Sequence, residues 1–255
     1  MMPEVQVTTD GPVVTVTIDR PHARNAVSLA TMGELEHALL HVQEQGDASV
    51  LVLRGGGDRA FVSGGDLKDL ARIETHEEAA AMATRMRRVL DTLVNLPIPT
   101  IAALNGHALG GGAEVAVACD LRLAANDVSI AFNQADLAIM PAWGGVERLV
   151  DLVGRSAAMH LLLSRSRITA ARAEMLGLLN GVLARDKFDN DVAAYARAIA
   201  ELPRSVPIAI KSIVSTSRPN SHPSSEAPAV DAFARLWVSD DHWSAVQALQ
   251  HRRRS

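Results

Sequence analysis

Two glycine-rich segments carry the residue types best suited to chemistry in this chain. One runs from Asn105 to Glu114 and holds three consecutive glycines, Gly110–Gly112, directly before Ala113 and Glu114. The other is 55–68, in which Gly64 and Gly65 precede Asp66. Glycine lets a ligand approach the backbone because it has no Cβ, and amides at a helix start stabilise negative charge. Backbone amides beside a carboxylate can therefore stabilise an oxyanion and move a proton.

Neither segment is a phosphate-binding loop of the common kinds. No Gly-Lys-Ser/Thr follows the glycines, and their spacing differs from the dinucleotide fingerprint. Glycine-rich turns also serve close packing, and a glutamate in a first helical turn complements the helix dipole. The presence of two such turns favours chemistry, because one amide from each would make a two-donor oxyanion hole.

Each turn is expected to lead from a buried strand into a helix. The strands are predicted at 51–54 and 100–104, and the helix after the triple glycine at 112–118. A hairpin is predicted around Asp10-Gly11, and Ser28 is the expected N-cap of a helix that reaches Gln45, with Gly46 after it. Other expected elements are a helix at 77–96, strands at 120–124 and 128–132, and helices only from Trp143 onward, with a Ser- and Pro-rich linker at 217–228.

Several motifs together resemble the crotonase family, the enoyl-CoA hydratase/isomerase superfamily, from about residue 5 to residue 214. The segments that carry the resemblance are Asp19-Arg20-Pro21 with Asn25-Ala26, Ala60-Phe61 with Ser63-Gly64-Gly65-Asp66-Leu67, Pro99 to Gly106, Gly110 to Glu114, Cys119-Asp120-Leu121-Arg122, and Pro141-Ala142-Trp143-Gly144-Gly145 with Arg148-Leu149. The resemblance implies an α/β fold, the ClpP-like crotonase spiral of ββα units over 1–200. It also implies a C-terminal helical region over 201–255 that covers the site and builds a homotrimer or a dimer of trimers.

The resemblance implies roles for the glycines and for Glu114. Gly65 and Gly111 would supply the oxyanion-hole amides for the thioester oxygen of an acyl-CoA, and Glu114 would be the principal acid and base. Hydratases of the family carry a second glutamate after the strand that ends at Phe132. Counted forward, Asp136 falls on that position; counted backward across a loop two residues shorter, Gln134 does. Asp136 is the predicted second catalytic residue, although its side chain is one methylene shorter than glutamate.

The substrate implied is an acyl-CoA thioester, with coenzyme A as part of the substrate and no prosthetic group. Arg24, Arg59 and Lys68 flank the motifs and are candidate phosphate partners. His107 is expected to be a packed histidine, and histidine spacing gives no sign of a metal site. The full set predicted to bind substrate or CoA is Arg24, Arg59, Ala60, Ser63, Gly65, Asp66, Leu67, Lys68, Gly111 and Trp143.

Three functions remain open at this stage. The leading prediction is an enoyl-CoA hydratase-type lyase that adds water to a 2-enoyl-CoA through an enolate. The shortened loop and the segment 141–145 look like decarboxylase-type crotonases that act on alkylmalonyl-CoA, and Trp143 would then form an apolar wall. The third is an acyl-CoA-binding family member with weak or no catalysis, because the second carboxylate departs from the family pattern.

Composition narrows the class of protein. With 255 residues and 48% hydrophobic content the chain can bury a large core, and a net charge of −4 gives no sign of nucleic-acid binding. The single cysteine, Cys119, excludes an intramolecular disulfide and makes the cytoplasm the expected location. No N-terminal leader pattern or bilayer-spanning apolar run is present, so no membrane partner is expected.

Overall fold

The fold is built on two sheets. A computed structural model describes residues 3–216 and 226–252. Six strands form the larger sheet, in the order β1 (Val5–Asp10), β2 (Val13–Ile18), β3 (Val50–Gly55), β5 (Thr100–Leu104), β7 (Leu121–Ala125) and β10 (Gly181–Leu183). The smaller sheet holds β4 (Ala60–Val62), β6 (His107–Leu109), β8 (Ser129–Ala131) and β9 (Ile168–Thr169).

A repeated ββα unit relates the two sheets. The first strands of successive units, β3, β5 and β7, lie parallel in the larger sheet, and the second strands, β4, β6 and β8, lie parallel in the smaller one. The units continue into α2 (Leu67–Leu70) with α3 (His76–Asn95), into α4 (Gly111–Val117), and into the 3-10 turn η2 (Gln134–Leu137) with α5 (Gly145–Ser164). The predicted spiral of ββα units is confirmed.

Local sequence signals set several element ends where they were expected. β1 and β2 pair antiparallel across the Asp10-Gly11 turn. Helix α1 (Leu29–Gln45) begins at Ser28, whose side chain accepts a hydrogen bond from the Thr31 amide, and ends at Gly46 with φ of 68°. The 3-10 turn η1 (Pro21–Ala23) lies between β2 and α1.

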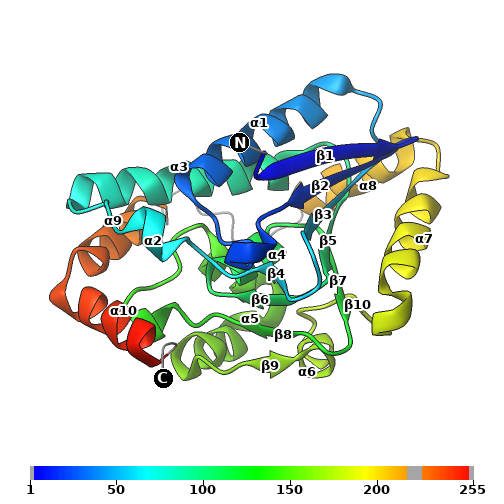
Figure 1. The fold of residues 1–255 in the computed structure, drawn as a ribbon. Coiled ribbons are helices and arrows are strands. Elements are labelled where there is room, and N and C mark those ends of the chain that lie inside the picture. The colour runs from blue at the N-terminus through cyan, green and yellow to red at the C-terminus, as the bar shows by residue number, and fades with distance from the viewer. Residues whose placement is uncertain (1–2, 217–225, 253–255) are drawn as a thin grey trace.

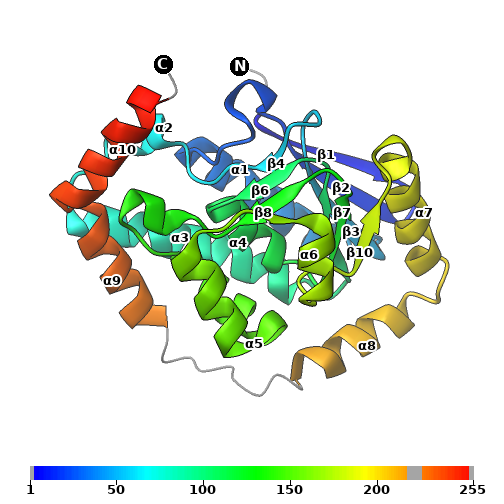
Figure 2. The same cartoon turned by 90° about the horizontal axis from the view of Figure 1, so that it is seen from below.

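Helices make up most of the remaining chain. They are α6 (Ala170–Met175), the 3-10 turn η3 (Arg185–Lys187), α7 (Phe188–Ala200), α8 (Ser205–Thr216), α9 (Glu226–Trp237) and α10 (Asp240–Arg252). Helix α9 packs along α3 and α10 packs on η2, at the end of the molecule opposite α7 (Figures 1 and 2). Residues 217–225 of the predicted linker lie outside the described residues. The division of the chain at residues 200 and 201 stays a prediction.

Four short strands correct the sequence analysis. The expectation of helices only after Trp143 is wrong, because β9 pairs with β8 and β10 pairs with β7. Both glycine segments also contain a strand, β4 and β6, before the turn. Strands of two or three residues are too short to show a period of two, and tertiary pairing alone makes them extended. The helical stretch expected from Trp143 begins with α5, which breaks at Gly154 with φ of 76°.

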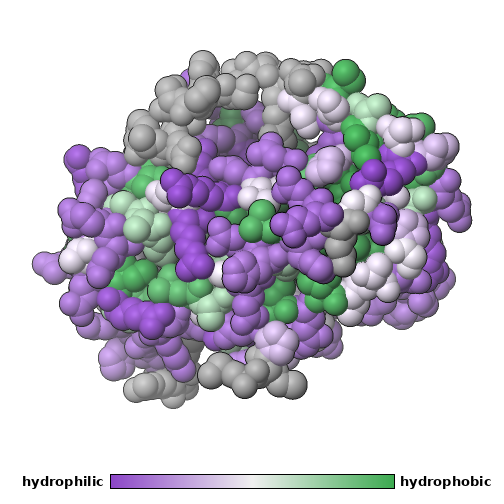
Figure 3. Space-filling view, turned by 90° about the horizontal axis from the view of Figure 1, so that it is seen from above, coloured by the Kyte–Doolittle hydropathy of each residue, from purple (hydrophilic) through white to green (hydrophobic). Residues whose placement is uncertain are grey.

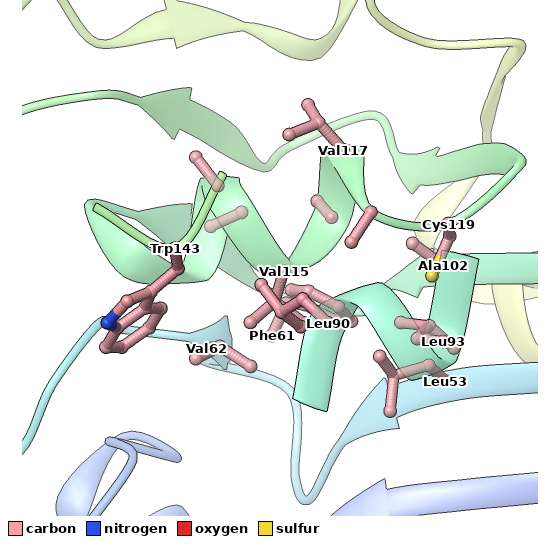
Figure 4. Packing of buried hydrophobic residues seen from close by; sticks show 14 of the residues in the cluster. Leu53, Phe61, Val62, Leu90, Leu93, Ala102, Val115, Val117, Cys119 and Trp143 are labelled. Carbon is pink, nitrogen blue, oxygen red and sulfur yellow. The ribbon is translucent and has the colours of Figure 1, made fainter. Parts of the chain in front are cut away.

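The core lies between the two sheets and the helices that pack on them, and its residues are mainly aliphatic. Val115 of α4 packs with Phe61 and Val62 of β4, and with Leu90 and Leu93 of α3 nearby, as Figure 4 shows. On the face drawn in Figure 3, hydrophilic side chains predominate and hydrophobic atoms show between them. Within the described residues, no helix is long and apolar enough to cross a membrane.

Candidate active site

One large cavity gathers the residues that the sequence singled out. Its volume is about 1500 Å³, above the usual range for a pocket that binds a drug-sized ligand. Its lining includes every residue predicted for the site: Glu114, Asp136, Gly65, Gly111, Arg24, Arg59, Ala60, Ser63, Asp66, Leu67, Lys68 and Trp143. The spiral therefore brings together segments that are far apart in the sequence.

Parallel pairing of β4 with β6 places the two glycine turns side by side. Each turn follows the end of its strand, and a Cβ built on Gly64 would lie only 3.3 Å from the amide nitrogen of Gly111. Helix α4 begins at Gly111, so the amide of this residue is one of the first donors of a helix. Within the described part of the chain, neither the Gly65 amide nor the Gly111 amide donates to a protein acceptor. Both amides are therefore available to one ligand oxygen.

Glu114 lies in the first turn of α4 and is 2% exposed. Its Oε1 accepts hydrogen bonds from the amides of Trp143, at 2.8 Å, and Gly145, at 3.0 Å. Its Oε2 accepts from Nε2 of Gln134 at 3.0 Å. A Cβ on Gly145 would lie 2.3 Å from Cγ of Glu114, so only glycine lets that amide come so close. Three donors thus hold the carboxylate in one orientation at the cavity wall.

Burial makes the carboxyl group of Glu114 an unusually weak acid. Removal from water raises the pKa of its carboxyl group to about 7, although the amides of Trp143 and Gly145, the Gln134 side chain and the Arg148 charge all lower it. A carboxyl group with a pKa near neutral pH can both accept and donate a proton there. This combination of fixed geometry and balanced protonation suits a general acid or base.

Gln134, and not Asp136, contacts Glu114. Gln134 is 8% exposed, and its Oε1 is buried without a partner among the described residues. Asp136 lies two residues further along η2, where its Oδ1 pairs with Nε of Arg165 at 3.4 Å and half of its side chain is exposed. The residue reached by the backward count is therefore the one that contacts Glu114. The catalytic role of Asp136 stays a prediction.

Trp143 forms an apolar wall next to the glycine turns. The residue is 5% exposed, and its indole lies at the edge of the packed cluster (Figure 4). A Cβ on Gly111 would lie 2.2 Å from Cζ3 of this indole, and a Cβ on Gly65 would lie 3.9 Å from its Cζ2. The ring therefore packs against the Cα atoms of both glycine turns, and Gly111 must remain glycine.

Basic side chains surround the cavity mouth. Arg24, Arg59 and Lys68 are exposed and make no ion pair among the residues described. Asp66 serves the local fold, because it caps α2 by accepting from the Lys68 amide and pairs with Arg20 at 2.9 Å. The arginine pair and the hydrogen bonds outweigh burial and lower the pKa of its carboxyl group.

Sequence analysis missed part of the cavity lining. Arg165 and Arg167 come from the end of α5 and the loop after it, and Phe233 and Trp237 come from α9. No local pattern marks them, because they approach the site only through tertiary packing. His107 also lines the cavity, where Nδ1 accepts from the Ser129 amide at 3.0 Å, and burial lowers the pKa of its ring. Over 3–216 and 226–252, no cluster of three His, Cys, Asp or Glu side chains could hold a metal ion.

Comparison with known families decides the wider identity of the chain. The family model described as enoyl-CoA hydratase/isomerase matches residues 8–254. The chain belongs to the enoyl-CoA hydratase/isomerase family. It is 35% identical over 216 residues to the mouse protein "Enoyl-CoA hydratase domain-containing protein 2, mitochondrial", which spans 82% of this chain and 72% of the relative. Short-chain-enoyl-CoA hydratase of Clostridium acetobutylicum is 32% identical over 204 residues, 79% of this chain and 76% of that protein.

Solved structures of the family share the fold of this member. An enoyl-CoA hydratase from Bacillus anthracis has a TM-score of 0.82 and 29% identity, over 98% of this chain and 96% of that one. Carnitinyl-CoA hydratase from Mycobacterium avium has a TM-score of 0.86 and 29% identity, over 99% and 97% of the two chains. This hydratase/isomerase family member has the crotonase fold and is an enzyme of that family.

Proposed function

We propose that the protein is a hydratase-type lyase that adds water to a 2-enoyl-CoA thioester. Glu114 carries the proposal, because its buried carboxylate is held by three hydrogen bonds beside the cavity and its pKa lies near 7. The names of relatives such as short-chain-enoyl-CoA hydratase and methylglutaconyl-CoA hydratase give the same class of reaction. Arg24, Arg59 and Lys68 are then the partners for the phosphates of coenzyme A.

The reaction runs through an enolate. The amides of Gly65 and Gly111 donate to the thioester oxygen and stabilise the negative charge that develops there. Glu114 takes a proton from water, whose oxygen bonds to the β-carbon while the carbon–carbon double bond shifts to the thioester. The protonated carboxyl group then returns the proton to the α-carbon. Gln134 cannot exchange protons, but its free Oε1 can accept a hydrogen bond from the attacking water.

Decarboxylation of an alkylmalonyl-CoA is the second candidate. An amide beside Glu114, in place of a second carboxylate, and the Trp143 ring against Gly111 favour it. Loss of carbon dioxide forms the same enolate in the same oxyanion hole without a water-activating pair, and an apolar wall disfavours a solvated carboxylate. In that reaction Glu114 only has to supply the final proton. Binding of acyl-CoA with little turnover remains the third candidate.

Mass spectrometry after incubation with crotonyl-CoA and with ethylmalonyl-CoA, in separate tubes, tests these functions. A gain of one water on crotonyl-CoA alone is the expected result. Loss of carbon dioxide from ethylmalonyl-CoA alone would replace the hydratase proposal with the decarboxylase. If both substrates bind but neither changes, the protein is a binding member; the Glu114→Gln variant serves as the control, because it keeps the cavity and removes the acid.

The assembly proposed is a homotrimer or a dimer of trimers. One exposed row on α8 supports it, since Val206, Ile210, Ile213 and Val214 are between 40% and 67% exposed. Analytical ultracentrifugation tests the assembly; a monomer at micromolar concentration would contradict it.

A further inference from the structure

A buried arginine lies beneath the loop that holds Glu114. Arg148 belongs to α5 and is 8% exposed. Its Nη1 donates to the carbonyl oxygen of Trp143 at 2.8 Å, and its Nη2 donates to Oδ1 of Asp91 on α3. The guanidinium group thus ties the 143–145 loop to α3. Burial of the Arg148 charge carries a desolvation penalty in free energy, so the position of this arginine calls for an explanation.

Hydrogen bonds to both backbone groups of Trp143 hold the 143–145 loop. The amide of Trp143 donates to Glu114, while its carbonyl oxygen accepts from Arg148. Gly144 follows with φ of 86°, and a Cβ on it would lie 2.6 Å from Nη1 of Arg148. This conformation turns the Gly145 amide back onto the same carboxylate oxygen. Movement of the guanidinium group would therefore move both amides that orient Glu114.

We propose that Arg148 is a positioning residue for the reaction: it fixes the 143–145 loop so that two amides hold Glu114. The inference rests on the proposed function, in which Glu114 moves the proton. Arg148 itself does not line the cavity and so acts through Glu114 and the loop. Asp91 supports it by fixing the other end of the guanidinium group.

The charges around Glu114 single out Arg148. The groups that donate to the carboxylate, two amides and the Gln134 side chain, are neutral. The Arg148 charge lowers the pKa of Glu114 against the effect of burial. Of the elements that pack on α4, β6 brings His107, whose ring bonds to Ser129, and α5 also brings Glu147, which pairs with Arg87. Strands β4 and β5 carry no charged side chain, and Asp136 of η2 pairs with Arg165.

A second ion pair between the same helices offers a matched control. Arg87 of α3 pairs with Glu147 of α5 at 3.0 Å; Arg87 lies one turn before Asp91 on α3, and Glu147 directly precedes Arg148 on α5. The side chain of Arg87 is buried like that of Arg148, with 11% of it exposed, but Arg87 makes no hydrogen bond to the 143–145 loop. Its removal therefore breaks an ion pair between α3 and α5 without releasing the two amides.

The experiment titrates Glu114 directly and by activity. Infrared spectroscopy follows the carbonyl stretch of the protonated carboxyl group, assigned by its loss in Glu114→Gln. In Arg148→Gln the midpoint should rise by about one pH unit, at the low end of shifts caused by a neighbouring charge. The kcat should fall while KM for acyl-CoA stays constant, and its pH profile should move with the midpoint. Arg87→Gln should leave the midpoint and the profile unchanged.

Arg148→Lys is a second variant, for the case in which Arg148→Gln does not fold. It keeps the charge but cannot bond Trp143 and Asp91 with the same planar fork, so kcat should fall with a smaller shift of the midpoint. A wild-type midpoint and kcat in folded Arg148→Gln or Arg148→Lys would overturn the inference, as would an equal shift in Arg87→Gln. If the midpoint moves as expected but Glu114→Gln keeps full turnover, the loop is positioned as inferred and the proposed function is what fails.

Discussion

The two sides of the cavity use different kinds of group. On one side, Gly65 and Gly111 present backbone amides, which need only parallel strands and the absence of a Cβ. On the other, Glu114, Gln134 and Trp143 present side chains; Glu114 belongs to the same helix as Gly111, but its orientation depends on η2 and the 143–145 loop. In the proposed mechanism, the backbone side stabilises a developing oxyanion whatever reaction makes it. The side-chain side would decide where the proton goes, and so the choice between hydration and decarboxylation.

Removal of the Glu114 carboxyl group should cause the largest loss of turnover among changes to the side-chain side. Glu114→Gln keeps the shape and the hydrogen-bond acceptor but cannot exchange a proton. We expect turnover of crotonyl-CoA to fall about 10³-fold, within the usual range for a general acid or base. Steady-state kinetics measure the loss, and isothermal titration with coenzyme A checks that binding persists. Turnover within tenfold of wild type would exclude Glu114 as the proton carrier.

A methyl group at Gly111 should lower turnover almost as much, through the backbone side. Its Cβ would overlap the Trp143 ring at 2.2 Å, so the amide must move away from the oxyanion position. A displacement on the order of 1 Å costs about 10²-fold in rate, and we expect such a loss in kcat for Gly111→Ala. The double variant with Trp143→Ala removes the obstructing ring and should recover part of the rate. No recovery would mean that the ring is not the cause.

Sequence patterns predicted the backbone side better than the side-chain side. Glycines after two strands predicted the paired turns, and the family resemblance identified Gly65 and Gly111 within them. The partner of Glu114 was not fixed in this way, because a shortened loop allows both Asp136 and Gln134 and only its folded path distinguishes them. Phe233 and Trp237 reach the cavity through the packing of α9 on α3, more than a hundred residues away along the chain.

The raised pKa of Glu114 should appear as a pH-dependent cost to stability. The folded protein keeps this proton up to a pKa of about 7, while the unfolded chain loses it near the ordinary value of 4.5. The free energy of unfolding should therefore fall as pH rises between these values, by about 3 kcal/mol. Urea denaturation of wild type and Glu114→Gln at pH 4.5 and pH 7 measures the difference. An equal pH dependence in both proteins would contradict the assignment.

Loss of the Gln134 amide should weaken the side-chain side moderately. Gln134→Ala removes one donor from Glu114 and the free Oε1 beside it. A hydrogen bond to a charged group contributes about 1.5–3 kcal/mol, so kcat should fall at least about tenfold. Gln134→Glu is the informative companion, because a second carboxyl group would raise the pKa of the pair. If Gln134→Ala turns over like wild type, water is oriented by another group.

Asp136→Asn should have the smallest effect and separates the two candidates for the second partner of Glu114. Asp136 is half exposed and pairs with Arg165 at the cavity rim, and an exposed ion pair of this kind contributes about 0–1 kcal/mol. Turnover should therefore stay within a factor of about three of wild type, well above that of Gln134→Ala measured in the same assay. A loss of 100-fold in Asp136→Asn would reverse the order. It would mean that η2 moves when substrate binds and brings Asp136 to the α-carbon, so that the cavity holds two acids after all.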